Sequence, residues 1–109
     1  MVIWSNEAKA DLRKIYKYIS TDFKLYADNV KNNIIDKADT LDEMNKRFQV
    51  EPEFNDDTIR YMIVYSYKLL YRIVNNEVIL VLGLPSQRQI LRKKFSNIYK
   101  IEIPSNRIK

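Results

Sequence analysis

A run of apolar and aromatic residues broken by three cations, at positions 59–73, constrains the fold most strongly. The run reads IRYMIVYSYKLLYRI, and its β-branched and aromatic residues favour strands. Asn75 and Asn76 follow it as a two-residue turn, because asparagine tolerates positive φ. The pattern therefore predicts strands over 58–65, 67–74 and 77–84, joined as consecutive antiparallel pairs.

The turn also predicts which side chains share a face. If Val74 pairs with Glu77, one face is wholly apolar or aromatic and should pack on helices. Its members are Tyr67, Leu69, Tyr71, Ile73, Val78, Leu80, Leu82 and Leu84. The opposite face carries Lys68, Leu70, Arg72, Val74, Glu77, Ile79, Val81 and Gly83. We expect this mixed face to stay open, and exposed apolar surface rimmed by charge is typical of a binding site.

Two helices are predicted before these strands. After a short strand at 2–4, Ser5 is a plausible N-cap and Glu7 suits the first helical turn. Apolar residues then recur at helical spacing over 6–19 and, after a break at 20–22, from 23 to about 45. The two stripes are Ala8, Leu12, Ile15 and Ile19, then Phe23, Ala27, Val30, Ile34, Ala38 and Leu41. The expected fold is α+β, with an antiparallel two-helix hairpin packed on one face of an antiparallel β-sheet, in a single domain spanning 1–109.

The composition excludes several kinds of site. The 109 residues include neither cysteine nor histidine, which removes disulfides, thiolate metal sites and the commonest acid–base side chain. No apolar run approaches the ~20 residues that span a bilayer, and no signal peptide opens the chain. We therefore expect a cytoplasmic protein without a metal or cofactor.

Positive charge is concentrated at the C-terminus. The net charge is +5, and residues 88–109 hold seven lysines and arginines against one acid, Glu102. This basic tail is either a solvated extension or a patch for a polyanion or an acidic protein.

Three segments in this order resemble the RelE/ParE superfamily of toxins from type II toxin–antitoxin modules. VIWSNEAKADLRKIYKYIS resembles the family's opening strand and helix, at Ala8, Asp11, Leu12, Ile15, Tyr18 and Ile19. IRYMIVYSYKLLYRI resembles its central hairpin, with Lys68 where arginine is common. VILVLGLPSQRQ resembles the end of the family pattern, where the last strand usually carries an arginine and a histidine often follows the strand. Here the strand has no arginine, and Pro85 lies near the histidine position.

The resemblance implies a growth-arresting toxin neutralised by a cognate small antitoxin in a hetero-oligomer. ParE-like members poison DNA gyrase, and RelE-like members cut mRNA on the translating ribosome. The missing arginine and histidine favour the ParE-like function over the endoribonuclease. A non-toxic nucleic-acid-binding module that uses the basic tail is a third interpretation, ranked last because the sequence has no helix-turn-helix and no paired aromatic platform for RNA.

Candidate site residues follow from both functions. A RelE-like nuclease would use Arg60, Lys68, Arg72 and Arg88, with Glu53 or Glu51 as a base, although a solvated loop is the simpler interpretation of both glutamates. A ParE-like toxin would bind its target or antitoxin through Lys68, Arg72, Arg88, Arg92, Lys93 and Lys94.

Overall fold

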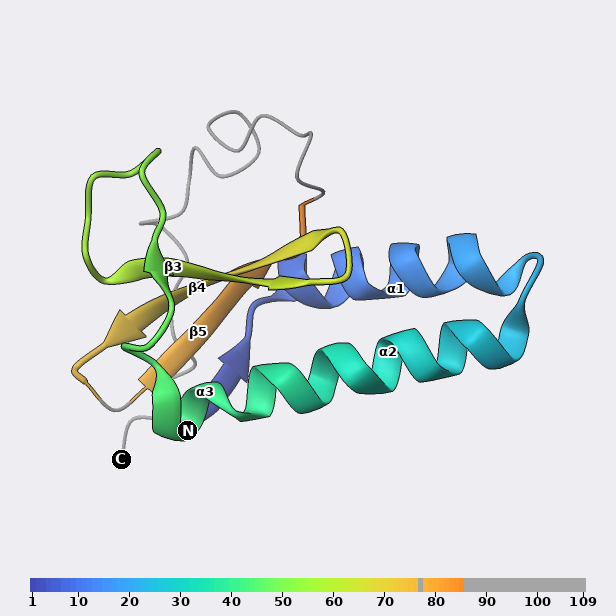
Figure 1. Cartoon of the computed structure of the whole chain (residues 1–109), viewed down its shortest axis with the longest axis horizontal. Helices are drawn as coiled ribbons and strands as arrows, with labels where there is room; N and C mark the ends of the chain where they lie inside the picture. The colour runs from blue at the N-terminus through green and yellow to red at the C-terminus, as the bar shows by residue number, and fades with distance from the viewer. Residues whose placement is uncertain (77, 86–109) are drawn as a thin grey trace.

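A two-helix hairpin covers one face of a five-stranded sheet in the computed structural model, which describes residues 1–76 and 78–85 (Figure 1). The elements in chain order are β1 (Val2–Trp4), α1 (Asn6–Ser20), α2 (Lys24–Asp39), α3 (Leu41–Met44), β2 (Gln49–Val50), β3 (Ile59–Val64), β4 (Tyr67–Val74) and β5 (Val78–Gly83). The strands lie in the order β1-β5-β4-β3-β2. The predicted α+β fold is confirmed. The sheet is mixed rather than antiparallel, because β1 pairs in parallel with β5.

Helix α1 begins and ends where local side chains satisfy its backbone. Ser5 accepts a hydrogen bond at its Oγ from the amide of Ala8 at 3.1 Å, as the predicted N-cap should. The hydroxyls of Ser20 and Thr21 both donate to the carbonyl of Lys17, which closes the last turn. The predicted apolar stripe is confirmed, with Ala8, Leu12 and Ile15 buried.

The second predicted helix is two helices in the structure. Helix α2 ends at Asp39, and Thr40 separates it from the short α3. The hydroxyl of Thr40 donates to the carbonyl of Lys37 at 2.6 Å, a local bond that competes with helical continuation. Phe23 was expected in the buried stripe, but it is the N-cap of α2 and is exposed.

The register of β5 differs from the prediction. Val74 pairs with Val78 rather than with Glu77, and a slip of one residue moves each side chain of a strand to the other face. Ile79 and Val81 therefore pack in the core under the helices, and Leu80 with its neighbours packs on the far side. The turn prediction itself holds, since Asn75 and Asn76 have φ of 57° and 61°.

An irregularity in the β4–β5 pairing changes the face to which the side chains at the end of β5 point, so that they again point towards the helices. Leu70 lies opposite Gly83, but the next residue, Tyr71, lies opposite Val81, so β5 contains one extra residue. This arrangement is that of a β-bulge. Leu84 consequently joins the core under the helices.

Much of the far face of the sheet is buried, contrary to the expectation of an open surface, although Ile63 on this face is exposed. A second apolar cluster there contains Ile3, Ile59, Leu70, Leu80 and Leu82. Phe54 packs against this cluster, so the loop between β2 and β3 folds over the sheet. Gln49 and Val50, directly before the two glutamates that were expected in a solvated loop, pair with β3 as the edge strand β2.

Candidate functional site

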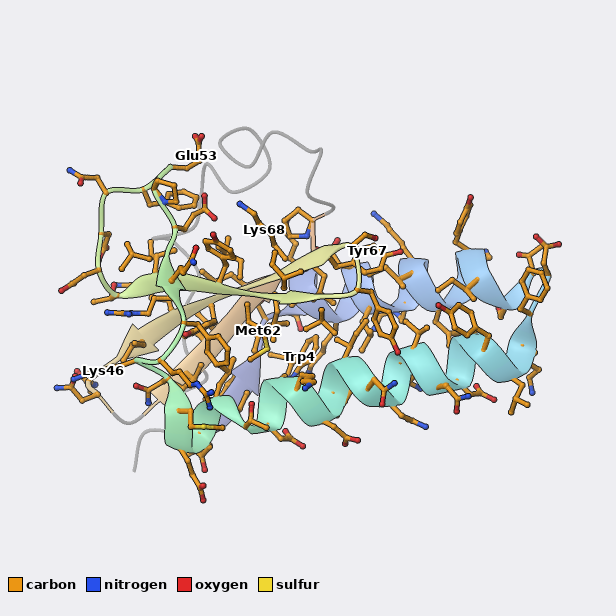
Figure 2. The ribbon with its side chains drawn as sticks, in the orientation of Figure 1. Trp4, Lys46, Glu53, Met62, Tyr67 and Lys68 are labelled. Carbon is orange, nitrogen blue, oxygen red and sulfur yellow. The ribbon has the colours of Figure 1, made fainter. Side chains whose placement is uncertain are left out.

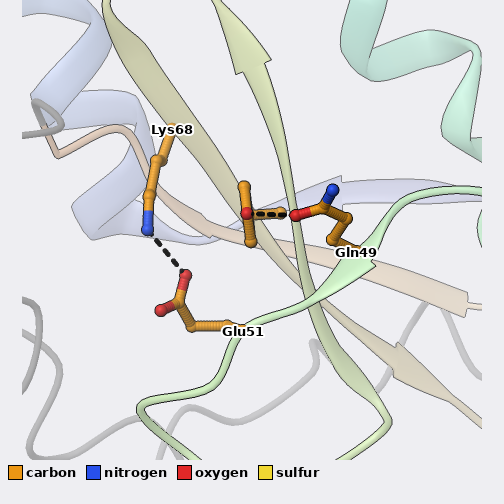
Figure 3. A network of polar contacts seen from close by, with 4 residues as sticks. Gln49, Glu51 and Lys68 are labelled. Atoms are coloured by element: carbon orange, nitrogen blue, oxygen red, sulfur yellow. Dashed lines mark hydrogen bonds and ion pairs between the residues drawn. The ribbon is translucent and has the colours of Figure 1, made fainter.

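A buried ion pair joins two of the predicted site residues. Nζ of Lys68 lies 3.1 Å from Oε2 of Glu51 (Figure 3). Glu51 is 1% exposed, and the amide of Glu51 donates to the carbonyl of Ile59 at 2.9 Å. The expectation that Glu51 belongs to a solvated loop is wrong. The ammonium of Lys68 compensates its charge, and the backbone bond fixes its position.

Tyr61 extends this pair into a small polar network. Nζ of Lys68 lies 4.4 Å from the centre of the Tyr61 ring, within the range of a cation–π contact. The Tyr61 hydroxyl in turn donates to Oε1 of Gln49 on β2 (Figure 3). The network thus ties the edge strand β2 and the following loop to β3 and β4. Periodicity could not indicate it, because Glu51 lies in a segment without regular spacing.

Arg60 donates hydrogen bonds to backbone carbonyls of the segment that precedes β3. Its Nε donates to the carbonyl of Asp57 at 2.9 Å, and its Nη1 donates to the carbonyls of Lys46 and Phe48 at 3.2 and 2.9 Å. Strand alternation places Arg60 on the same side of β3 as the buried Met62, away from the Lys68 pair. The guanidinium therefore stabilises the segment that connects α3 to β3.

Two more candidates, Arg72 and Glu53, lie in β4 and in the loop between β2 and β3. Arg72 is half-buried and lies between Ile59 and Leu80 in the sheet. Glu53 is exposed and points outward from its loop, whereas Lys68 projects from β4 (Figure 2). The other four candidates, Arg88, Arg92, Lys93 and Lys94, lie outside the described residues.

A groove between α1 and α2 brings cations together that the sequence pattern did not single out. The hollow has a volume of about 310 Å³ and is lined by Leu12, Arg13, Tyr16, Lys17 and Lys31. Tyr16 spans the helices by donating to Oδ1 of Asp28 at 2.7 Å, and Nζ of Lys31 lies 5.4 Å from the centre of its ring. This bond to Asp28 is the main reason that the pKa of Tyr16 is raised. The result is an apolar floor with a basic rim, which suits an acidic segment with apolar side chains.

The fold has a counterpart among solved structures. A chain from a structure described as a chromosomal ParDE TA system from P. aeruginosa matches with a TM-score of 0.65 and 18% identity, over 78% of this chain and 92% of that chain. No curated protein sequence matches the chain. The family model for the ParE toxin of the type II toxin–antitoxin system parDE matches residues 2–91. The chain belongs to the ParE toxin family. This match confirms the predicted membership of the RelE/ParE superfamily. It also agrees with the preference for a ParE-like member that the sequence indicated.

Two further properties of this ParE-family protein concern its environment. No helix in residues 1–76 and 78–85 is long and apolar enough to cross a membrane. Within the same residues, no cluster of three or more acidic side chains could hold a metal ion.

Tyr71 makes the ParE-family fold sensitive to alkaline pH. Burial raises the pKa of Tyr71 from 10.0 to about 12, although the nearby Arg60 acts in the opposite direction. Because the folded-state pKa is the higher one, the stabilising contribution is complete below about pH 10 and is lost as the pH rises towards 12. The hydroxyl also donates to the carbonyl of Asn45 at 2.6 Å, a bond that holds the end of α3 to β4.

We expect Tyr71→Phe to lower the free energy of unfolding by about 1 kcal/mol at pH 8, where it removes a hydrogen bond. The difference from the unchanged protein should shrink as the pH rises from about 9 to about 11.5, since phenylalanine has no titrating group. Denaturant unfolding at a series of pH values measures both effects. A difference that stays constant over this range would show that Tyr71 does not have a raised pKa.

Proposed function

We propose that this chain arrests bacterial growth by inhibiting DNA gyrase, and that a cognate small acidic antitoxin neutralises it in the cytoplasm as a hetero-oligomer. The observation that supports this function best is the engagement of the candidate catalytic residues in structural contacts. Lys68 and Glu51 are paired with each other, and Arg60 binds three backbone carbonyls. A gyrase inhibitor requires a complementary surface and no such catalytic residues.

The competing function is a ribosome-dependent endoribonuclease. Cleavage through the 2′-hydroxyl requires a base, an acid and a cation near one phosphate. Glu51, a potential base, is buried and paired with Lys68, and Glu53 is exposed on its loop. This arrangement among the described residues favours binding over catalysis.

The groove between α1 and α2 is the proposed position for a segment of the antitoxin. Arg13, Lys17 and Lys31 would face its carboxylates, and Leu12 and Tyr16 would contact its apolar side chains. Such a helix-in-groove arrangement combines apolar anchors with charge complementarity. The basic residues Arg88, Arg92, Lys93 and Lys94 are proposed to add affinity for an acidic partner.

The purified protein should inhibit supercoiling by DNA gyrase and should leave mRNA intact in a translating ribosome extract. Its induction alone should stop bacterial growth, and co-expression of the small acidic protein encoded beside it should restore growth. Supercoiling assays and mapping of mRNA 5′ ends measure the two activities on the same preparation.

Two substitutions separate binding from catalysis. Growth arrest should survive Glu53→Ala, since the side chain is exposed, whereas Arg72→Ala on the sheet should weaken it. Codon-specific cuts that both variants abolish while remaining folded would replace gyrase inhibition by the nuclease function.

A further inference from the structure

The tip of the helical hairpin exposes an aromatic surface that neither the core nor the groove uses. Tyr18, Phe23 and Tyr26 are 82%, 66% and 53% exposed, although large apolar side chains are usually buried. They surround a shallow hollow of about 370 Å³ together with Ile19, Thr21 and Asp22. We name Tyr18, Phe23 and Tyr26 the tip patch. The helices carry it past the β3–β4 turn to one end of the molecule (Figure 1).

The tip patch also borders the sheet. Tyr67, at the start of β4, packs against the core under the helices. The pKa of Tyr67 is raised, mainly by its burial and further by the neighbouring Tyr18 and Tyr26. Tyr67, beside the β3–β4 turn, is therefore a neighbour of two members of the tip patch (Figure 2).

Backbone hydrogen bonds fix the connection between α1 and α2, and they therefore fix the backbone that carries the three aromatic side chains. The amides of Asp22 and Phe23 both donate to the carbonyl of Ile19, at 3.2 and 2.9 Å. The carbonyl of Phe23 accepts from the amide of Ala27 at 2.9 Å, which starts α2. A preorganised surface loses less conformational entropy on binding, and this favours a role in recognition.

The tip patch and the basic groove lie on different flanks of α1. At 3.6 residues per turn, Tyr18 is about 140° around the helix from Arg13. On α1, the buried Ile15 lies between Tyr18 and the groove residue Leu12, and the groove and the hollow at the tip share no lining residue. Two partners could therefore contact α1 without sharing side chains.

The size and shape of the patch indicate what kind of partner covers it. The three rings expose roughly 400 Å² in total. A stable interface needs about 800 Å² from each partner, so two copies meeting tip to tip would bury too little. A projecting tip gains contact area when it enters a cleft, because the sides of both helices are then covered as well. Only a folded protein offers a cleft lined by apolar pockets. A short acidic segment of the antitoxin has no cleft, and its side chains suit the groove between α1 and α2.

We propose that the tip patch is the surface by which this toxin enters an apolar cleft on its folded protein target, separate from the surface that the antitoxin covers. This inference rests on the proposed function for the existence of a protein target and adds where that target binds. Tyr18 and Phe23 are the anchors, since they are the most exposed members of the patch. Asp22 lines the hollow and the exposed Lys24 directly follows Phe23 in sequence, so both are placed to meet polar groups at the rim of the cleft.

The double variant Tyr18→Ser/Phe23→Ser tests the proposal in the full chain. Exposed side chains contribute little to folding, and serine at position 23 is a favoured N-cap for α2. We expect at least about tenfold more protein to be needed for half-maximal inhibition of supercoiling, because aromatic anchors dominate interface energies. Growth arrest should be lost, while affinity for the antitoxin should stay within about threefold of the unchanged protein. The matched control is Val50→Ser/Ile63→Ser, which removes two exposed apolar residues, 38% and 47% exposed, that lie on β2 and β3 rather than on the helical hairpin.

The outcomes separate this inference from the proposed function. Full growth arrest by the folded tip variant would overturn the inference, and so would a loss of antitoxin affinity without a loss of toxicity. An equal loss of toxicity in the control would also overturn it, since the effect would not be specific to the tip. If the unchanged protein arrests growth without inhibiting gyrase, gyrase is the wrong target. In that case the growth assay of the tip variant still tests the inference: a loss of growth arrest supports binding of the actual target through the tip patch, and full growth arrest contradicts it.

Discussion

Lys68→Met should lower the free energy of unfolding by about 3–5 kcal/mol, because it leaves the carboxylate of Glu51 buried without its ammonium partner. Glu51 is 1% exposed, and Lys68 is its partner at 3.1 Å. Lys68 is 21% exposed, so water screens part of the interaction and the lower end of this range is expected. For a chain of this length, the loss corresponds to a fall in melting temperature of more than about 10 °C. Thermal and denaturant unfolding at neutral pH measure it.

A second substitution shows whether the loss of stability comes from the unpaired charge of Glu51 or from lost packing of Lys68. Glu51→Met added to Lys68→Met removes both charges and fills the site with apolar side chains, which is often neutral or stabilising. The double variant should therefore recover most of the lost stability. Lys46→Met, at an exposed position, is the control for the loss of one lysine. If Lys68→Met costs less than about 1 kcal/mol, the pair behaves as a surface ion pair and this interpretation is wrong.

The helical hairpin could be predicted closely because its signals are local. Ala8, Leu12 and Ile15 follow the helical period and are buried, and Ser5 has the side chain that an N-cap requires. Phe23 also fits the period, yet it is exposed. Periodicity indicates the side of a helix that is apolar, but it cannot show where the sheet beneath that side ends.

The sheet was harder to predict because two small backbone differences decide its faces. Asn75 and Asn76 were correctly placed in a turn, but a loop with one more residue moved Leu80 and Leu82 to the far face. The extra residue near Gly83 then returned Leu84 to the core under the helices. Both faces are apolar in β5, so hydrophobic pattern alone could not select between the two registers.

The functional roles of the candidate site residues stay predictions, but the contacts of these residues could not be predicted from the sequence. Lys68 and Arg72 were correctly placed in one strand, but the partner of Lys68 lies 17 positions away, in a segment without regular spacing. Arg60 was a candidate only for a RelE-like nuclease, and its donors bind carbonyls of the α3–β3 connection. Long-range pairs of this kind depend on how a loop folds back, which no local pattern records.

The double charge reversal Arg13→Glu/Lys17→Glu should weaken the complex with the antitoxin by at least about 100-fold. Both cations line the proposed antitoxin groove, and like charges placed across an interface cost several kcal/mol. Most of the loss at low salt should appear in the association rate, because charge steers the encounter. The effect should decrease as salt is raised, since the Debye length falls from about 10 Å at 0.1 M to about 3 Å at 1 M. Kinetic binding measurements at several salt concentrations test both statements.

The control for this reversal keeps the same change in net charge. Lys37→Glu/Lys46→Glu alters exposed lysines that do not line the groove. Lys37 is in the last turn of α2, and Lys46 lies at the end of the molecule opposite the hairpin tip (Figure 2). This control should weaken the complex far less, since only long-range attraction changes. The groove variant should still arrest growth, and the antitoxin should no longer restore it, because the tip patch lies on another flank of α1. If the two charge reversals weaken binding equally, net charge alone explains the affinity and the antitoxin does not occupy the groove.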